Sequence, residues 1–357
     1  MIFKKYGAKE IPVRKNFLPL FLISCLLIPS AFAEKASAPL DEKSLIELAA
    51  QGQAEAQFNL AMFYQSHRQL DNALNWYLLS ANQGFSKAQI NLALIYQEGS
   101  GVPKDEKLML HWMQLAAENG DPIGQMNMAE YTLHGIDNIL EKDPQAAENW
   151  LKKAAEQRFP AAMLTLAYWY EEGKAVTKNP KKAQAIYQTL AKENHPQALY
   201  LLGYQAATGM YDKVDYPLAF EYFTRAADLN FSPAQNSLGM LYLTGQGTKK
   251  NTQLAIKWLT LAAKQGEVSA QFNLALIYAR GDGTKADQEK ACHWFIKAAQ
   301  QNSTDAQYAS GACYQYGMGV EQDEMKALRW YKLAAAKGNE RAEKKVLILE
   351  NNLKNKK

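Results

Sequence analysis

One short pattern recurs along this chain at a nearly constant interval, and this repetition limits the possible folds more than any other feature. A small residue, usually followed by glutamine, opens each unit at Ala56, Ala88, Gly124, Ala162, Ala198, Ala234, Ala270 and Ala306. The starts are 32, 36, 38, 36, 36, 36 and 36 residues apart, and a half-match at Ala342 follows after another 36. A period of this length predicts stacked supersecondary units in place of one globular core.

Each unit has the same internal pattern, in which we count the opening small residue as position 0. Position 5 is Ala or Gly and position 8 is usually Tyr. Positions 0, 4, 5 and 8 share one helical face, so each unit is predicted to open with an amphipathic first helix. Position 11 is glycine in seven successive units, which favours a helix end with positive φ. These glycines are Gly99, Gly135, Gly173, Gly209, Gly245, Gly281 and Gly317.

A polar cap and a second helix follow each of these glycines. Asp and Asn accept hydrogen bonds from the free amides that open a helix. Six residues after the glycine the caps are Asp105, Asn179, Asp215, Asn251, Asp287 and Asp323, with Asp143 displaced by a two-residue insertion. The glycine-rich segment "GDGTK" at 281–285 is therefore predicted to be a turn between helices. The GxxxxGK[ST] spacing of a phosphate-binding P-loop is absent from the sequence.

These residues resemble the Sel1-like repeat family, a relative of the tetratricopeptide repeat. The last unit matches the family pattern at Ala306-Gln307, Gly311, Tyr314, Gly317, Gly319, Val320, Asp323, Lys326-Ala327, Trp330, Ala334-Ala335 and Gly338. The resemblance covers roughly residues 48–345. It implies an all-α fold, an α-solenoid in which antiparallel helix pairs form a right-handed superhelix, and a protein-binding scaffold. In bacteria, exported members are linked to envelope assembly and to contacts with host cells.

Two units depart from this pattern. The first unit, from Ala56, is four residues shorter and lacks the GxG turn, so it resembles a tetratricopeptide unit. The fifth unit has Ala206 in place of the position-8 tyrosine, and Tyr222 where most units carry tryptophan. Helix packing in the fifth unit is therefore expected to differ from that in its neighbours.

We expect four segments in the chain. Residues 1–33 have the pattern of a signal peptide, because a basic start precedes a 12-residue, mostly apolar stretch and then Ala31-Phe32-Ala33. Residues 34–52 are expected to hold an N-terminal capping helix, residues 53–338 about eight tandem repeats, and residues 339–357 a C-terminal capping helix and tail. The apolar stretch is shorter than the ~20 residues of a membrane span.

The leader predicts export to the periplasm or out of the cell. Two alternatives stay open, namely an uncleaved membrane anchor and lipidation at Cys25, which ends a lipobox-like Leu22-Ile23-Ser24-Cys25. Removing the leader leaves 35 basic and 35 acidic residues. A nucleic-acid-binding protein needs clustered positive charge, so this balance argues against that class.

Signatures of catalysis and of metal binding are missing from the sequence. The five histidines form no HExxH motif or other close ligand pair, and neither Ser-x-x-Lys nor Gly-x-Ser-x-Gly occurs. We therefore expect no catalytic, metal-binding or cofactor-binding residues. Cys292 and Cys313 align with apolar positions of the other units, so free buried thiols are the default expectation. A disulfide is the alternative, because disulfides persist in exported proteins.

The predicted partner-binding surface is a groove lined by positions 2 and 6 of the first helices. At ~100° per residue these positions lie opposite the stacking face, and the resemblance to tetratricopeptide arrays implies that this side is concave. The residues predicted to line it are Phe58, Leu164, Tyr168, Tyr200, Tyr204, Phe272 and Tyr308, with a hot spot at Leu164, Tyr168, Tyr200 and Tyr204. The alternative is that helix packing buries these side chains.

The sequence therefore predicts an exported, non-enzymatic scaffold that binds another protein or peptide through this groove. One alternative from another class is an envelope enzyme of the weak β-lactamase or peptidoglycan-binding type, which some Sel1-like proteins resemble. A disulfide together with slow nitrocefin turnover would favour that alternative. A third possibility is a periplasmic scaffold for polysaccharide export.

Overall fold

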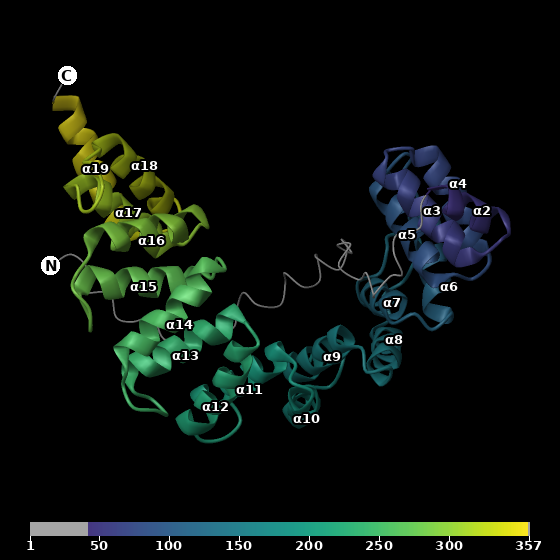
Figure 1. Ribbon diagram of the computed structural model, residues 1–357, viewed down its shortest axis with the longest axis horizontal. Coiled ribbons are helices and arrows are strands. Elements are labelled where there is room, and N and C mark those ends of the chain that lie inside the picture. The colour runs from purple at the N-terminus through teal and green to yellow at the C-terminus, as the bar shows by residue number, and fades with distance from the viewer. Residues whose placement is uncertain (1–41, 356–357) are drawn as a thin grey trace. The chain divides into compact units, whose positions relative to one another are not determined.

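The computed structural model describes residues 42–355, and this part of the chain is helical apart from turns and one β-bridge between Ile136 and Leu140. Successive helices pack side by side in chain order from α2 to α9 and again from α11 to α19 (Figure 1). The helices are α2 (Glu42–Ala50), α3 (Ala54–Ser66), α4 (Leu70–Asn82), α5 (Ser86–Glu98), α6 (Glu106–Glu118), α7 (Pro122–His134), α8 (Pro144–Glu156), α9 (Pro160–Glu172), α10 (Pro180–Lys192), α11 (Pro196–Thr208), α12 (Tyr216–Asp228), α13 (Ser232–Thr244), α14 (Thr252–Lys264), α15 (Val268–Arg280), α16 (Gln288–Gln300), α17 (Thr304–Tyr316), α18 (Glu324–Ala335) and α19 (Glu340–Asn355).

The described chain forms two compact units, and the boundary between them falls inside α10. We call residues 42–187 the amino-terminal unit and residues 188–355 the carboxy-terminal unit. In each unit the odd-numbered helices from α3 to α17 are the first helices of the repeats, and the even-numbered helices from α4 to α18 are the second helices. The predicted all-α architecture of tandem helix pairs is confirmed.

The predicted caps open the second helices as expected. The Asp105 side chain accepts hydrogen bonds from the backbone N–H groups of Lys107 and Leu108, both at 2.9 Å. Equivalent bonds to backbone N–H groups are accepted by Asp143, Asn179, Asp215, Asn251, Asp287 and Asp323. Each bond satisfies an amide that has no partner within its own helix, which fixes where the second helix begins.

The predicted glycines end the first helices in a left-handed conformation. Gly99 has φ 75° and ψ 33°, and the same region is adopted by Gly173, Gly209, Gly245, Gly281 and Gly317. Gly135 differs, with φ 71° and ψ 170°. The two-residue insertion follows Gly135, and the Ile136–Leu140 bridge forms there. The segment 281–285 is a turn between α15 and α16, as predicted.

A second glycine, at position 13, lies against the start of the second helix of the preceding repeat. A Cβ atom on Gly101 would lie 2.9 Å from the Cβ of Leu70, so only glycine allows this approach. Gly247, Gly283 and Gly319 lie in the same way against Tyr216, Thr252 and Gln288. The third, fourth and fifth repeats have Asp137, Ala175 and Tyr211 at this position.

The leader predicted for residues 1–33, with its cleavage site and its possible lipidation at Cys25, lies outside the described residues. From residue 42 to residue 355, none of the helices is both long enough and apolar enough to pass through a bilayer.

Candidate functional site

The position-2 side chains of the first helices pack inside their own repeats. The ring of Tyr200 lies 5.7 Å from that of Phe223 in α12, and the ring of Phe272 lies 5.5 Å from that of Phe295 in α16. Tyr308 and Tyr331 (5.4 Å) and Phe58 and Tyr77 (5.8 Å) form the same contact. Position 2 therefore belongs to the interface between the two helices of one repeat, where aromatic pairs bury much apolar area.

This packing corrects most of the predicted groove. Tyr200 and Phe272 are each 3% exposed, and Leu164, Tyr204 and Tyr308 are also buried. These five side chains are core residues in the structure, and Tyr200, Phe272 and Tyr308 pack on the second helices of their own repeats. Of the seven predicted residues, Phe58 and Tyr168 keep part of their surface. Leu164 and Tyr168 lie one turn apart on α9, and Tyr200 and Tyr204 lie one turn apart on α11.

Accessible side chains remain at positions 3 and 6 of the first helices in the amino-terminal unit. All eight are exposed or half-buried, and Met62 is 43% exposed. We call this set the inner row, and it consists of Asn59, Met62, Asn91, Leu94, Asn127, Glu130, Thr165 and Tyr168. Among them, Asn91 donates a hydrogen bond to the Tyr77 hydroxyl at 3.1 Å, and Asn127 donates to the Ile123 carbonyl at 2.9 Å. Position 3 of the row thus holds three amides and a threonine, and position 6 holds mostly apolar side chains.

The same two positions are buried throughout the carboxy-terminal unit. They hold Leu201, Tyr204, Ser237, Met240, Asn273, Leu276, Ala309 and Ala312. Asn273 donates a hydrogen bond to Asn236 at 3.1 Å between α15 and α13, so two amides that could have faced a ligand satisfy each other. An accessible row is therefore a property of the amino-terminal unit.

A partly buried carboxyl group lies among these packed helices of the carboxy-terminal unit. Glu267 caps α15 by accepting a hydrogen bond from the Ser269 backbone at 3.3 Å. Burial raises the pKa of Glu267 above that of an ordinary glutamate. Burial also raises the pKa of Tyr200, and the nearby Glu267 carboxylate adds to this effect. Packing holds the Tyr200 hydroxyl away from water, and the partly buried Glu267 side chain serves as a helix cap.

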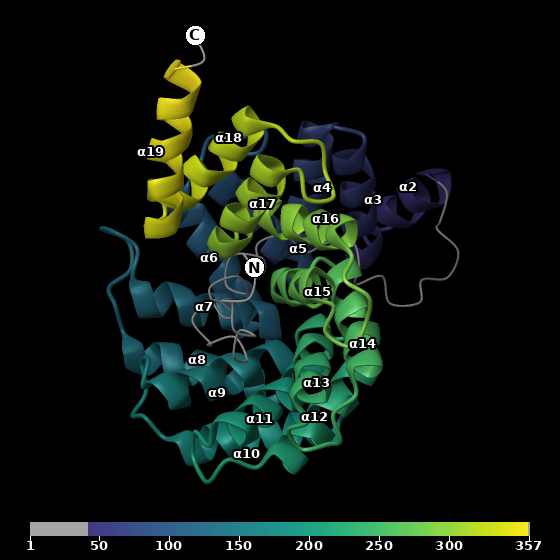
Figure 2. The same cartoon turned by 90° about the vertical axis from the view of Figure 1, so that its left-hand side faces the viewer.

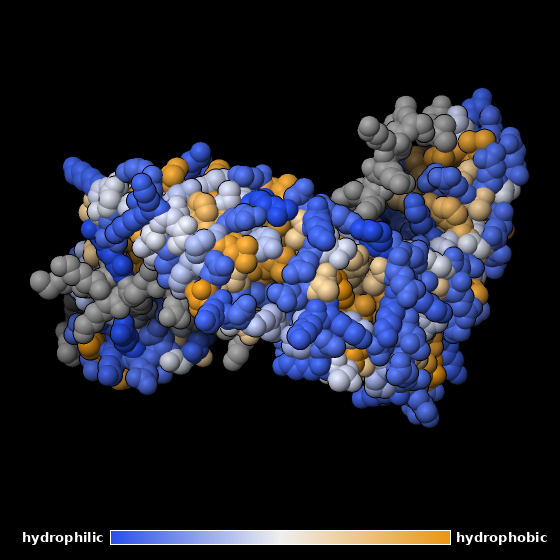
Figure 3. Space-filling view, turned by 90° about the horizontal axis from the view of Figure 1, so that it is seen from below, coloured by the Kyte–Doolittle hydropathy of each residue, from blue (hydrophilic) through white to orange (hydrophobic). Residues whose placement is uncertain are grey.

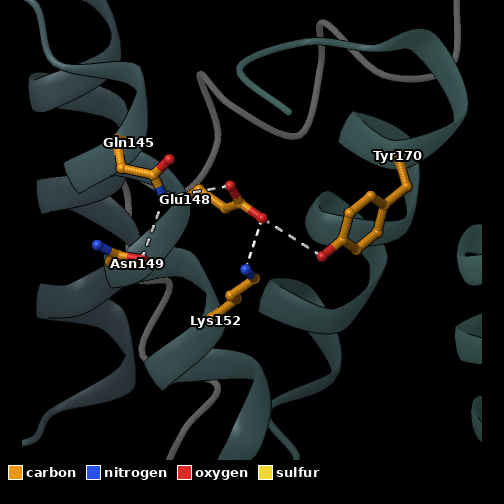
Figure 4. Close-up of polar contacts among 5 residues, drawn as sticks. All are labelled: Gln145, Glu148, Asn149, Lys152 and Tyr170. Atoms are coloured by element: carbon orange, nitrogen blue, oxygen red, sulfur yellow. Dashed lines mark hydrogen bonds and ion pairs between the residues drawn. The ribbon is translucent and has the colours of Figure 1, made fainter. Parts of the chain in front are cut away.

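The amino-terminal unit carries a polar cluster on α8 and α9 (Figure 4). Glu148 Oε1 forms an ion pair with Lys152 Nζ at 2.6 Å and accepts a hydrogen bond from the Tyr170 hydroxyl at 3.5 Å. The bond to Glu148 raises the pKa of the Lys152 ammonium group. Gln145 reaches both Glu148 and Asn149 at 3.5 Å. The cluster neutralises its own charge and holds two helices together.

The described residues contain no group of three or more His, Cys, Asp or Glu side chains arranged to hold a metal ion.

A hydrogen-bond network of glutamines joins consecutive repeats, and the sequence analysis assigned it no role. Gln89 donates to the Ala81 carbonyl at the end of α4 (3.0 Å) and accepts from Asn119 at the end of α6 (3.0 Å). Position-1 glutamines that donate in the same way are Gln57, Gln125, Gln235, Gln271 and Gln307. The sequence pattern that could have revealed this network is the recurring Ala-Gln dipeptide at the start of most repeats. Met163 and Leu199 interrupt it in the fourth and fifth repeats.

The two cysteines of the described chain form a disulfide, which corrects the default expectation of free thiols. Cys292 in α16 and Cys313 in α17 are both fully buried and are 21 residues apart. Each occupies a position that is apolar in other repeats, and the two positions meet where the second helix of one repeat touches the first helix of the next. Alignment with apolar residues therefore indicated burial correctly but missed this contact.

Comparison with known proteins places this arrangement in a family. The Sel1 repeat family pattern matches residues 54–85, 86–121, 122–159, 160–195, 196–231, 232–267, 268–303 and 304–339. A Sel1 repeat protein from Oxalobacter formigenes is 26% identical, with a TM-score of 0.75, and the match covers 96% of this chain and 97% of that protein. A protective antigen of uropathogenic Escherichia coli with the same repeat fold is 27% identical, with a TM-score of 0.67, and the match covers 88% of this chain and 68% of the antigen.

A curated relative is similar over a shorter stretch. The chitin synthase regulator SKT5 of Saccharomyces cerevisiae is 36% identical over 73 residues, which span 20% of this chain and 10% of the yeast protein. Repeats of this kind are typical of scaffolds that bind other proteins, and they are generally not enzymes. With eight matched repeats and a helix pair at each of them, the chain belongs to the Sel1 repeat family.

Proposed function

We propose that this chain is a non-enzymatic scaffold whose amino-terminal unit binds an extended segment of another protein along the inner row. The observation that carries the proposal is the accessibility of this row, whose counterparts in the carboxy-terminal unit are buried. Asparagine amides can both donate to and accept from a peptide backbone. Methionine, leucine and tyrosine provide the kind of side chains that anchor interfaces. Of the residues predicted from the sequence, Tyr168 lies in the row and Phe58 lies one turn before Met62.

Apolar side chains on the surface have to be distinguished from a binding site. On the face seen in Figure 3, hydrophobic patches are separated by hydrophilic side chains, as on many protein surfaces. A binding site is therefore identified by comparing the effect of a substitution within it with that of a substitution at a similarly exposed residue elsewhere. Met62 in the inner row and Leu79 on α4 suit this comparison, because they are 43% and 49% exposed.

The test is a quantitative pull-down from envelope and host-cell extracts with the full chain. The variants are Met62→Asp combined with Tyr168→Ser, and Leu79→Asp as the matched control. Circular dichroism checks that each variant is folded. We expect a captured protein to be lost from the inner-row variant and retained by the control. Equal capture by all three chains would contradict the role of the inner row, and equal loss from both variants would indicate a nonspecific effect.

We further propose that the chain is exported. The leader of residues 1–33 and the Cys292–Cys313 disulfide both support this, because disulfides persist in oxidising compartments. Cell fractionation and sequencing of the mature amino terminus test the proposal, with a start at Glu34 expected. An acylated Cys25 would replace cleavage with a lipid anchor, and an intact leader would favour a membrane anchor.

Two partner classes follow from the relatives. The E. coli relative is described as a protective antigen, which supports a search among envelope and host-cell proteins. The yeast relative is described as a regulator of chitin synthase, which supports the alternative of a scaffold for polysaccharide synthesis or export. Capture of polymer-synthesis proteins by the inner row would favour the second class.

The enzyme alternative retains one supporting observation, the disulfide. Its other requirement is slow hydrolysis of nitrocefin by the purified chain. Turnover that scales with protein concentration and disappears on reduction would favour the envelope-enzyme alternative over the scaffold.

A further inference from the structure

Helix α19 occupies the place of a first helix in a ninth repeat. Ala342 follows Ala306 by 36 residues, and it is fully buried, like the position-0 residues before it. The helix packs on α18 through Leu349, which is 1% exposed, and through the half-buried Val346. Figure 2 shows α19 at the edge of the carboxy-terminal unit, with α18 on one side. Within residues 42–355, no second helix covers its other side.

The uncovered side of α19 corresponds to a surface that is always buried in complete repeats. At position 5 the eight repeats have alanine or glycine, all buried. This position faces the second helix of its own repeat, since a Cβ atom on Gly311 would lie 2.6 Å from the Tyr331 ring. In α19, positions 5 and 6 are Leu347 and Ile348, which are 63% and 50% exposed. Leu347 is the most exposed large apolar residue of the described chain. It lies where the second helix would pack in a complete repeat.

We propose that this face of α19 binds the same face of a second copy of the chain, with the two helices antiparallel about a two-fold axis between Leu347 and Ile348. Helical geometry, at 100° and 1.5 Å per residue, then sets Leu347 against the partner's Leu347 and Ile348 against the partner's Ile348. Such a two-fold contact uses one surface patch on both copies, which is the commonest arrangement in homodimers.

The charges on this face favour self-pairing. In the antiparallel register, Glu340 lies near the partner's Lys354, and Lys344 lies near the partner's Asn351. The four side chains Glu340, Lys344, Asn351 and Lys354 are exposed. Each dimer therefore gains two contacts between Glu340 and the partner's Lys354, which carry opposite charges. In this register, none of these four residues lies opposite a like charge. Glu350, at the margin of the face, already pairs with Lys332 of α18 at 2.7 Å.

The size of the contact indicates a reversible dimer. One helix pair covers less than the ~1,200 Å² that stable interfaces bury, so dimerisation should depend on protein concentration. The surface lies on a different helix from the inner row, so this inference does not rest on the proposed function.

Sedimentation velocity of the full chain over a concentration series tests the apolar centre. We expect a monomer–dimer equilibrium that Leu347→Asp weakens by at least about tenfold in Kd. Leu79→Asp, which alters a leucine of similar exposure on α4, should leave the equilibrium unchanged. Circular dichroism shows whether either variant has lost helix. A monomer at every concentration would overturn the proposal, as would a dimer that is indifferent to Leu347→Asp.

A charge exchange tests the register and the identity of the partner. Glu340→Lys alone and Lys354→Glu alone should each weaken self-association, because each puts like charges together at both ends. An equal mixture of the two variants should regain association, since every contact then joins opposite charges. If the mixture associates no better than the separate variants, the antiparallel register is wrong. Pull-down of one tagged variant by the other provides the readout without sedimentation.

Discussion

The two units of this protein use one repeat pattern to opposite effect. In the amino-terminal unit, positions 3 and 6 of the first helices remain accessible, whereas in the carboxy-terminal unit the same positions are buried. Position 5 differs as well. It is alanine in α3, α5, α7, α9 and α15, but glycine in α11, α13 and α17. A Cβ atom on Gly203 or Gly239 would lie 2.8 Å from the second helix, so these helix pairs approach more closely than alanine allows.

The difference teaches that family membership does not decide which face of a repeat is a surface. Glycine at position 5 allows a close helix approach in three repeats of the carboxy-terminal unit, whereas α15 has Ala275 at this position and still buries Asn273 and Leu276. The side chains at positions 3 and 6 and their neighbours therefore also determine whether the face is filled or left open. The carboxy-terminal unit adds a disulfide between α16 and α17. Positions 3 and 6 are therefore more tightly packed in the carboxy-terminal unit, and their accessibility in the amino-terminal unit is the basis of the proposed binding role.

The largest expected effect comes from truncating position 2 in each unit. Phe272→Ala removes a buried ring that packs on Phe295 and should cost about 3–5 kcal/mol of local stability. Phe58→Ala removes a half-buried ring and should cost about 1–2 kcal/mol. Native-state hydrogen exchange of α15 and α3 measures each cost within its own unit. Equal losses would remove the contrast in packing between the units.

Removing the disulfide should affect the carboxy-terminal unit alone. It closes a loop with a sequence separation of 21 residues, so its loss should lower stability by about 3 kcal/mol. The measurement is urea unfolding of the Cys292→Ala/Cys313→Ala variant, followed by hydrogen exchange of α16, α17 and, as an internal control, α5. Protection lost to the same extent in α5 would mean that the two units do not respond separately.

The elements of the fold could be predicted from the sequence because their signals are local. Asp105 caps α6 and Gly99 ends α5 through contacts within a few residues. Each of these features can therefore be recognised from neighbouring residues in the sequence alone. The inner face could not be predicted in the same way. Position 2 lies only about 60° from position 5 around the helix, and a first helix is surrounded by its own second helix and by neighbouring repeats. The spacing of apolar residues along a first helix then indicates that they are buried, but it does not identify which neighbouring helix covers them.

The division into two units was not predicted, and the disulfide was only the alternative to free thiols, for a related reason. Met163 and Leu199 interrupt the glutamine network, and Ala175 and Tyr211 replace the second glycine, in the repeats on either side of the boundary in α10. The consequence of each substitution depends on the contact between repeats that the usual residue makes at that position. Cys292 and Cys313 likewise match apolar positions, and only the packing of α16 on α17 brings them together.

The proposed cause of the contrast can be tested by changing position 5. Gly311→Ala would place a methyl group 2.6 Å from the Tyr331 ring, so the helices must separate, at a cost of about 1–3 kcal/mol. Ala93→Gly in α5 makes no such clash and should cost only about 1 kcal/mol through helix propensity. Thermal unfolding measures both. If Gly311→Ala proved neutral or stabilising, close approach at glycine could not explain the buried face.

The smallest effect concerns pH and involves Tyr77, a buried tyrosine of the amino-terminal unit. Tyr77 of the amino-terminal unit faces its own first helix, as Phe223 and Phe295 do in the carboxy-terminal unit. Its hydroxyl donates to Gln65 at 2.6 Å and accepts from Asn91 at 3.1 Å. Burial raises the pKa of Tyr77 to about 12, which the bond from Asn91 partly opposes, and burial raises the pKa of Tyr131 to about 12.

The sign of the effect follows from proton binding. Above pH 10 the unfolded chain loses the tyrosine proton while the folded chain keeps it, so stability that is complete below pH 10 declines toward pH 12. Between pH 10 and pH 11 each of these tyrosines should cost about 1 kcal/mol. Tyr77→Phe should lower stability at pH 7, because Gln65 and Asn91 lose a partner, yet it should flatten the alkaline decline. Urea unfolding at pH 7, 10 and 11 checks both. A decline as steep in Tyr77→Phe as in the parent would mean that this hydroxyl ionises as readily in the folded chain as in the unfolded one.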